Sequence, residues 1–123
     1  MRYLCLLYND EGTVDAMSRS QFDALVTEAL SYDDVLRASG HYLASGALQS
    51  VQTATTIRIR DGRPLATDGP FAETREQLGG FILIEARDLD DAIRVAAKIP
   101  PARLGCVEVR PIRELHLPAR IER

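Results

Sequence analysis

The residue types best suited to chemistry are concentrated in the tetrapeptide Asp68-Gly69-Pro70-Phe71. Its simplest interpretation is a turn, because Asp accepts backbone hydrogen bonds, Gly allows a positive φ and Pro fixes the φ that follows. In that interpretation Phe71 anchors the turn to the core. The alternative is that Asp68 is a carboxylate held rigidly at a strand end, near Glu73 and Arg75, where it serves as a general acid or base or anchors a ligand.

A second candidate set lies in the alternating segment Val107-Glu108-Val109-Arg110-Pro111. The valines share one face of a strand, and Glu108 and Arg110 share the other. If the valine face meets the helices, the two charges point into the space on the other side of the sheet, where Arg58 could join them. Such charges either form an ion-pair network that fixes strand register or bind a small molecule that carries a carboxylate or phosphate.

The remaining reactive residue types are sparse. His41 is one of two histidines, and it is a weak catalytic candidate because an isolated His more often lies at a surface or a helix end. Cys5 and Cys106 lie inside apolar runs, which predicts buried free thiols. Two Cys and two His at these spacings match no zinc site, and no glycine-rich phosphate loop is present. We therefore expect no metal, no organic cofactor and no Ser-His-Asp or Cys-His catalytic set.

Hydrophobic periodicity predicts the elements that must position these residues. Ser18 and Gln21 form a capping box at the start of a helix of about twenty residues, and Gly40 ends the helical pattern. The segment 41–51 is expected to turn at Gly46, and Asp88 is expected to cap a second helix that Pro100 ends. In chain order the predicted elements are a strand over 2–8, a helix over 18–40, a hairpin over 53–67, a strand over 81–86, a helix over 88–99 and a strand over 104–110.

This order predicts an α+β fold, a ferredoxin-like βαββαβ sandwich with an antiparallel sheet and an extra hairpin. Two helices cover only one face of such a sheet, yet the strands over 2–8 and 81–86 carry apolar side chains on both faces. The second face therefore needs a cover. A second copy packed sheet to sheet about a two-fold axis is the simplest one, so we predict a homodimer in the form of a dimeric α/β barrel.

Length and charge exclude several classes of protein. The 123 residues fit a single domain, which we place over 1–112, followed by a tail over 113–123 that packs little or contacts a partner. The 18 acidic and 15 basic residues are interleaved and give a net charge of −3, which argues against nucleic-acid binding. The apolar run near the N-terminus is too short for a signal peptide or a membrane span, so we expect a cytoplasmic protein without a membrane partner.

Three stretches in order resemble the YCII-related family in its DGPF branch. They are residues 1–8, the stretch 68–81, in which Asp-Gly-Pro-Phe is followed by Glu-x-x-Glu-Gln-Leu-Gly-Gly, and the stretch 105–112 with Glu-Val-Arg-Pro. The resemblance implies the ferredoxin-like dimeric α/β barrel. Some members are similar to cofactor-independent enzymes that act on chlorinated aromatic ring products through a His-Asp pair, with the His on the first helix. This chain has no His over 18–38, so that pair cannot be carried over.

These observations give one leading hypothesis and three alternatives. The leading hypothesis is a homodimer that binds a small polar or anionic molecule, aromatic in one version, in a cavity between the subunits. Its polar anchors would be Asp68, Glu108 and Arg110, with Glu73, Arg58 and His41 as second choices. One alternative is an enzyme for elimination, isomerisation or hydrolysis with Asp68 as acid or base. Another, implied by the occurrence of the DGPF branch beside extracytoplasmic-function sigma factors, is a regulatory module that contacts a sigma factor through its tail or through the outer faces of its helices. The last is a structural dimer without a ligand.

Overall fold

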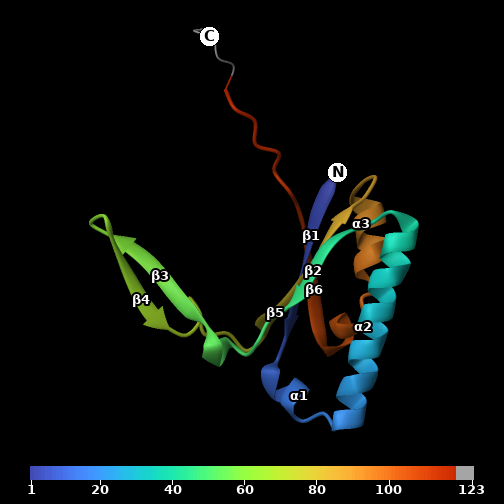
Figure 1. Cartoon of the computed structure of the whole chain (residues 1–123), viewed down its shortest axis with the longest axis horizontal. Coiled ribbons are helices and arrows are strands. Elements are labelled where there is room, and N and C mark those ends of the chain that lie inside the picture. Colours follow the sequence, from blue (N-terminus) through green and yellow to red (C-terminus); the bar gives the residue numbers. More distant parts are fainter. Residues whose placement is uncertain (119–123) are drawn as a thin grey trace.

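The computed structural model describes residues 1–118. In chain order its elements are β1 (Arg2–Asn9), α1 (Glu11–Asp15), α2 (Arg19–Ser39), β2 (Tyr42–Ala47), the 3-10 helix η1 (Val51–Thr53), β3 (Thr55–Arg60), β4 (Arg63–Asp68), β5 (Gln77–Glu85), α3 (Leu89–Ala96), the 3-10 helix η2 (Pro100–Leu104) and β6 (Gly105–Pro111). Four strands form a sheet in the order β2-β5-β1-β6, and all its pairings are antiparallel. The helices α2 and α3 lie on one face of this sheet (Figure 1). The ferredoxin-like α+β fold is confirmed, with the β3–β4 hairpin inserted between β2 and β5.

Local signals set the helix ends. The Ser18 side chain accepts a hydrogen bond from the backbone N–H of Gln21, and the Gln21 side chain accepts one from Ser18, so the predicted capping box begins α2. Gly40 ends α2 with φ of 81°, a left-handed conformation that favours glycine. Asp88 caps α3 as predicted, by accepting from the backbone N–H of Asp91 at 2.9 Å. Within the described residues, no helix has the length and apolar character that crossing a membrane requires.

The segment around Gly46 differs from the prediction. It does not turn there but continues as the edge strand β2, which pairs with β5 and places Gly46 opposite Phe81. A Cβ at position 46 would lie 2.9 Å from the Phe81 ring. The glycine therefore makes room for an aromatic side chain of the neighbouring strand, and the turn follows only after β2.

The core lies between the sheet and the two helices. Alternate residues of the central strands point into it, and Cys5 and Ile84 are completely buried there. The full set of buried apolar residues is Tyr3, Cys5, Leu7, Leu36, Ile82, Ile84, Ala86, Ala92, Val95, Ala96 and Ile99. Val107 and Val109 pack against this cluster, so the valine face of β6 meets the helices as the alternation predicts. The other thiol, that of Cys106, is exposed rather than buried, because its position on β6 alternates away from the core.

The opposite face of the sheet, here called the outer face, is apolar and uncovered in the single chain. Leu4 and Leu6 of β1 alternate with the buried residues, and their sheet partners on β5 are Leu83 and Phe81. All four side chains are only partly buried. Two central strands thus carry apolar residues on both faces, as the sequence indicates.

The β3–β4 hairpin, here called the arm (Thr55–Asp68), projects from the body on the side of the sheet opposite the helices (Figure 1). Its two strands pair only with each other, from Thr55 with Asp68 to Arg60 with Arg63. After β6 the chain has no further helix or strand up to residue 118, and the start of this tail is held by an ion pair of 2.9 Å between Arg2 and Glu114.

Candidate functional site

A pocket of about 680 Å³, here called the arm-base pocket, lies where the arm leaves the body. Its walls come from the end of β1, the connection between β2 and β3, and the loop that follows β4. The lining residues are Tyr8, 48–51, 53–56, 70–72, 74 and 76–78. Most of this surface is apolar, and its volume falls in the range of roughly 300–1,000 Å³ that is usual for small-molecule sites.

The short helix α1 holds one wall of this pocket in place. The carboxylate of Glu11 accepts hydrogen bonds from the Ser50 hydroxyl at 2.8 Å and from the backbone N–H of Val51 at 2.9 Å. The backbone N–H of Glu11 in turn donates to the side-chain oxygen of Gln77 at 3.2 Å. The pocket wall is therefore tied to α1, and α1 is tied to β5.

One lining residue of the pocket, Tyr8, forms a hydrogen-bonded pair with Glu108 on the outer face of the sheet. The Tyr8 hydroxyl donates to a carboxylate oxygen of Glu108 at 3.1 Å. Burial, followed by the hydrogen bond and the negative charge of Glu108, raises the pKa of Tyr8, so this hydroxyl stays a neutral donor at neutral pH. Glu108 and Arg110 lie opposite Leu6 and Leu4 of β1. They share the outer face with these leucines, as the alternation of β6 predicts.

The Asp-Gly-Pro-Phe tetrapeptide forms the turn that joins the arm to the pocket. Gly69 has φ of 102°, and its N–H donates to the carbonyl of Ala54 at 2.8 Å, which closes the base of the arm. Pro70 and Phe71 line the pocket. Phe71 does not anchor the turn to the core. It is 80% exposed, because the loop runs along the surface beside the arm.

The other predicted site residues do not converge with Glu108 within one chain. Asp68 is exposed as the last residue of β4, and Arg58 is exposed on β3 of the projecting arm. Glu73 is exposed on the loop after it. Among the hydrogen bonds and ion pairs of residues 1–118, none joins Asp68, Glu73 or Arg58 to another side chain, and Arg110 has no ion-pair partner there. The arm carries Arg58 away from the sheet, whereas Asp68 lies at the base of the arm, paired with Thr55.

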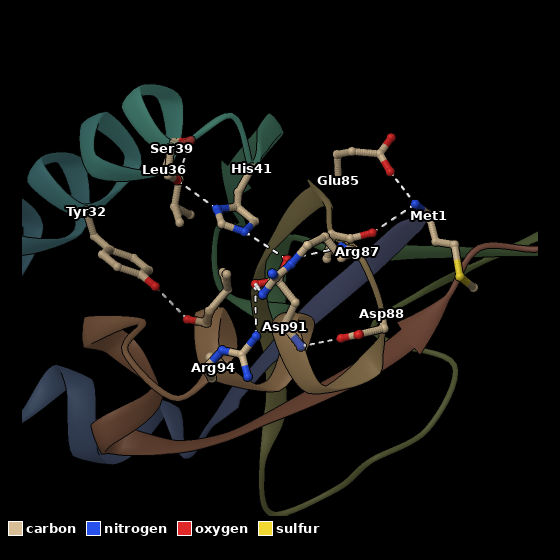
Figure 2. A network of polar contacts seen from close by, with 12 residues as sticks. Met1, Tyr32, Leu36, Ser39, His41, Glu85, Arg87, Asp88, Asp91 and Arg94 are labelled. Carbon is tan, nitrogen blue, oxygen red and sulfur yellow. Dashed lines mark hydrogen bonds and ion pairs between the residues drawn. The ribbon is translucent and has the colours of Figure 1, made fainter.

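His41 directly precedes β2 and belongs to a different cluster, which Figure 2 shows. Its Nε2 lies 3.1 Å from Oδ2 of Asp91 in α3, and its Nδ1 lies 2.7 Å from the hydroxyl of Ser39. The hydroxyl of Ser39 is also 3.1 Å from the carbonyl of Leu36. Because a serine has one hydroxyl hydrogen, it can donate either to Leu36 or to His41, and the tautomer of His41 decides which.

Asp91 is the buried charged residue of the described chain and the centre of this cluster. Its Oδ2 accepts the backbone N–H of Arg87 at 3.0 Å, while the guanidinium groups of Arg87 and Arg94 lie 3.7 and 3.6 Å from Oδ1. The hydrogen bond from the Arg87 backbone, followed by that from His41, lowers the pKa of Asp91 to about 2. The carboxylate is thus fully engaged in tying the end of α2 to the start of α3.

Sequence reasoning missed Asp91. A local signal was present, because Asp91 is an acidic residue in the first turn of the helix that Asp88 caps, where negative charge is favoured. His41 and Asp91 line a shallow depression of about 400 Å³ together with Ser39 and residues 85–87. Within residues 1–118, no group of three or more His, Cys, Asp or Glu side chains is placed to hold a metal ion.

Comparison with known proteins places this architecture in a family. A model of the YCII-related domain matches residues 1–116. The chain belongs to the YCII-related family. This YCII-related chain is 34% identical over 114 residues to an uncharacterized protein of Rhizobium meliloti (strain 1021), covering 91% of this chain and 92% of that protein.

A solved structure shares the fold. It is the 5-chloro-2-hydroxyhydroquinone dehydrochlorinase of Burkholderia phenoliruptrix AC1100 in complex with 2,5-dihydroxybenzoquinone, with a TM-score of 0.52 and 16% sequence identity. The match covers 92% of the YCII-related chain and 94% of the dehydrochlorinase. At this identity the likeness establishes the fold of the YCII-related chain and leaves its chemistry to the site itself.

Proposed function

We propose that this YCII-related protein is a homodimer that binds a small hydroxylated aromatic molecule between the outer face of the sheet and the base of the arm. The observation that carries the proposal is the arm-base pocket, a largely apolar space of about 680 Å³ lined by Tyr8, whose hydroxyl donates to Glu108 on the neighbouring strand. Apolar walls with a few polar groups are the usual composition of small-molecule sites, in which the polar groups fix the orientation of the ligand.

The uncovered outer face supports the dimer. Leu4, Leu6, Phe81 and Leu83 remain partly exposed in the single chain, and no element of residues 1–118 packs on them. A second sheet packed on this face about a two-fold axis would cover the same four residues of both copies. Because Glu108 and Arg110 share this face, the same packing would place their charges inside the cavity between the subunits.

The polar pair defines the chemistry of the ligand. A carboxylate such as Glu108 accepts hydrogen bonds from ring hydroxyls, and Tyr8 offers a hydroxyl that can donate or accept. An aromatic ring suits the apolar walls of the pocket. The dehydrochlorinase that shares the fold acts on a chlorinated hydroxyhydroquinone, which supports this class of molecule.

The test is a calorimetric titration of the protein with 2-hydroxyhydroquinone under nitrogen. We expect saturable binding that Glu108→Gln weakens about tenfold or more, because a hydrogen bond to a charged group contributes about 1.5–3 kcal/mol. The matched control is Glu114→Gln, which removes a carboxylate from the Arg2 ion pair outside the pocket and should leave binding unchanged. Absence of saturable binding, or equal effects of the two variants, would contradict the proposal.

A second candidate function is catalysis on the same class of compound, with Asp68 as acid or base. It is favoured by the position of Asp68, two residues before Pro70, which lines the pocket together with Phe71. The expected activity is chloride release from a chlorinated hydroxyhydroquinone, lost in Asp68→Asn while the dimer persists. If the wild-type protein releases chloride no faster than buffer, the catalytic candidate fails and the binding proposal stands.

A further inference from the structure

We propose that the arm of each subunit packs its apolar face on the partner subunit, so that each arm closes one side of the cavity between the two sheets. The proposal rests on the sheet-to-sheet dimer proposed above and adds to it a second contact, made by residues 55–68. The occupant of the apolar face of the arm is therefore a second copy of this chain.

The arm has two unlike faces. Residues directly opposite each other in an antiparallel pair share a face, so Ile57 shares one with Ala66, and Ile59 shares it with Pro64. The other face carries Arg58 opposite Leu65 and Arg60 opposite Arg63. One face thus carries four apolar residues in two neighbouring cross-strand pairs, and the other is predominantly basic.

The apolar face is uncovered in the single chain. Ile57 is 56% exposed and Ile59 is 65% exposed. A two-stranded hairpin is at best marginally stable in water, and exposed β-branched residues on such a hairpin invite pairing with other chains. An arm of this composition needs a surface to pack on, and its strands pair with no other strand of the described chain.

The direction of the arm identifies that surface. The arm projects on the side of the sheet opposite α2 and α3, which is the side of the uncovered outer face (Figure 1). Six strand residues at about 3.3 Å each give the arm a reach of roughly 20 Å, whereas packed sheets lie about 10 Å apart. A second sheet on the outer face would therefore lie beside the arm, and the arm would extend past that sheet.

If the arm packs on the partner in this way, Asp68 and Arg58 lie on opposite sides of the arm relative to the cavity. Thr55 pairs with Asp68, two positions from the pair of Ile57 and Ala66, so Asp68 lies on the apolar face at the base of the arm. The packed arm would present Asp68 toward the cavity between the subunits. Arg58 lies on the opposite face and would point away from it.

The first experiment compares two substitutions on the same hairpin. Ile59→Asp places a charge on the apolar face, and Leu65→Asp places one on the basic face at a similar exposure of 53%. Because both side chains are exposed in the single chain, both variants should fold. We expect Ile59→Asp to raise the dissociation constant of the dimer at least tenfold in sedimentation equilibrium and Leu65→Asp to change it little. Equal effects, or no effect of either substitution, would overturn the arm contact.

The second experiment separates the arm contact from the sheet contact. Trypsin can cleave the arm after Arg58 and after Arg60, and it can cleave the tail after the exposed Arg113. In the full chain, cleavage of the arm relative to the tail should fall at least tenfold as the protein concentration rises through the range of dimer formation. A dimer whose arm is cut at the same relative rate at every concentration would overturn the arm contact and leave the sheet dimer standing. A chain that stays monomeric at every concentration would overturn both.

Discussion

Two neighbouring residues of β5, Leu83 and Ile84, should affect different properties of the protein when truncated. Ile84 faces the core and should affect folding, whereas Leu83 faces the proposed partner and should affect association. Ile84 pairs with Tyr3 of β1 and is completely buried beneath the helices. Leu83 pairs with Leu4 on the outer face and is only partly buried. Truncating each to alanine perturbs one strand at adjacent positions with nearly equal loss of volume.

The two expected magnitudes follow from these environments. Ile84→Ala leaves a cavity in the core and should lower the free energy of unfolding by about 2–5 kcal/mol. Leu83→Ala removes apolar carbon that the strand neighbours already shield in part, so we assign it about 1 kcal/mol per copy from burial at the interface. Because both copies of the dimer carry the substitution, the free energy of association falls by about 2 kcal/mol, which is roughly a 30-fold weaker association.

Sedimentation equilibrium measures the dimer, and urea unfolding followed by circular dichroism at two protein concentrations measures the fold. Ile84→Ala should lower the unfolding midpoint at both concentrations. Leu83→Ala should act mainly by weakening association, so its effect on the midpoint should depend on protein concentration. If Leu83→Ala leaves the association constant at the wild-type value, the outer face is not the dimer interface and the reasoning from alternation is refuted.

Three further predictions concern the fold itself. Because the pKa of Asp91 is lowered from 3.8 to about 2, its charge stabilises the fold above about pH 4, and this stabilisation is lost as the pH falls toward 2. Asp91→Asn should therefore flatten the plot of urea unfolding midpoint against pH in this range. An unchanged slope would contradict the role of Asp91. A Cβ at Gly105 would collide with the backbone carbonyl of Tyr8, so Gly105→Ala should unfold or precipitate the protein. A Cβ at Gly40 meets no neighbouring atom, so Gly40→Ala should lower the free energy of unfolding by only about 1 kcal/mol, because of the positive φ at this position. Thermal melts measure both effects. Burial raises the pKa of the Cys5 thiol to about 11, so Cys5 should resist alkylation by iodoacetamide at pH 8 until denaturant is added. Peptide mass spectrometry measures the alkylation. Rapid alkylation of Cys5 in the native protein would contradict its burial.

The sequence predicts the parts of the fold that local signals determine. The capping box at Ser18, the cap at Asp88 and the Asp61-Gly62 turn each act within a few residues, and each lies where the structure has it. The alternation in β6 predicts which face carries Glu108, because a strand has a fixed period of two. The strand β2 was missed because its sequence, Tyr-Leu-Ala-Ser-Gly-Ala, has no β-branched residue, and its pairing with β5 decides its conformation.

The candidate site and the His41–Asp91 cluster are less predictable because their members come from distant segments. His41 and Asp91 are separated by 50 positions, and only the packing of α3 beside the end of α2 brings them together. The pocket at the arm base likewise needs Glu11, Ser50 and Gln77 to meet from three segments. Residue types indicate which groups could take part, but the angle at which the arm leaves the sheet is a property of the folded chain. This angle places Arg58 far from Glu108 within one chain.

The Asp-Gly-Pro-Phe turn links these observations, because it joins the base of the arm to the pocket. The left-handed Gly69 and its hydrogen bond to Ala54 close the base of the arm, while Pro70 and Phe71 form a wall of the pocket directly beside it. A change in this turn would therefore move the arm and reshape the pocket together. If the arm packs on a partner as proposed, the shape of each binding pocket depends on the dimer, because the partner limits where the arm can lie. Binding of a ligand in the pocket would then strengthen association of the subunits, and association would strengthen binding by the same factor.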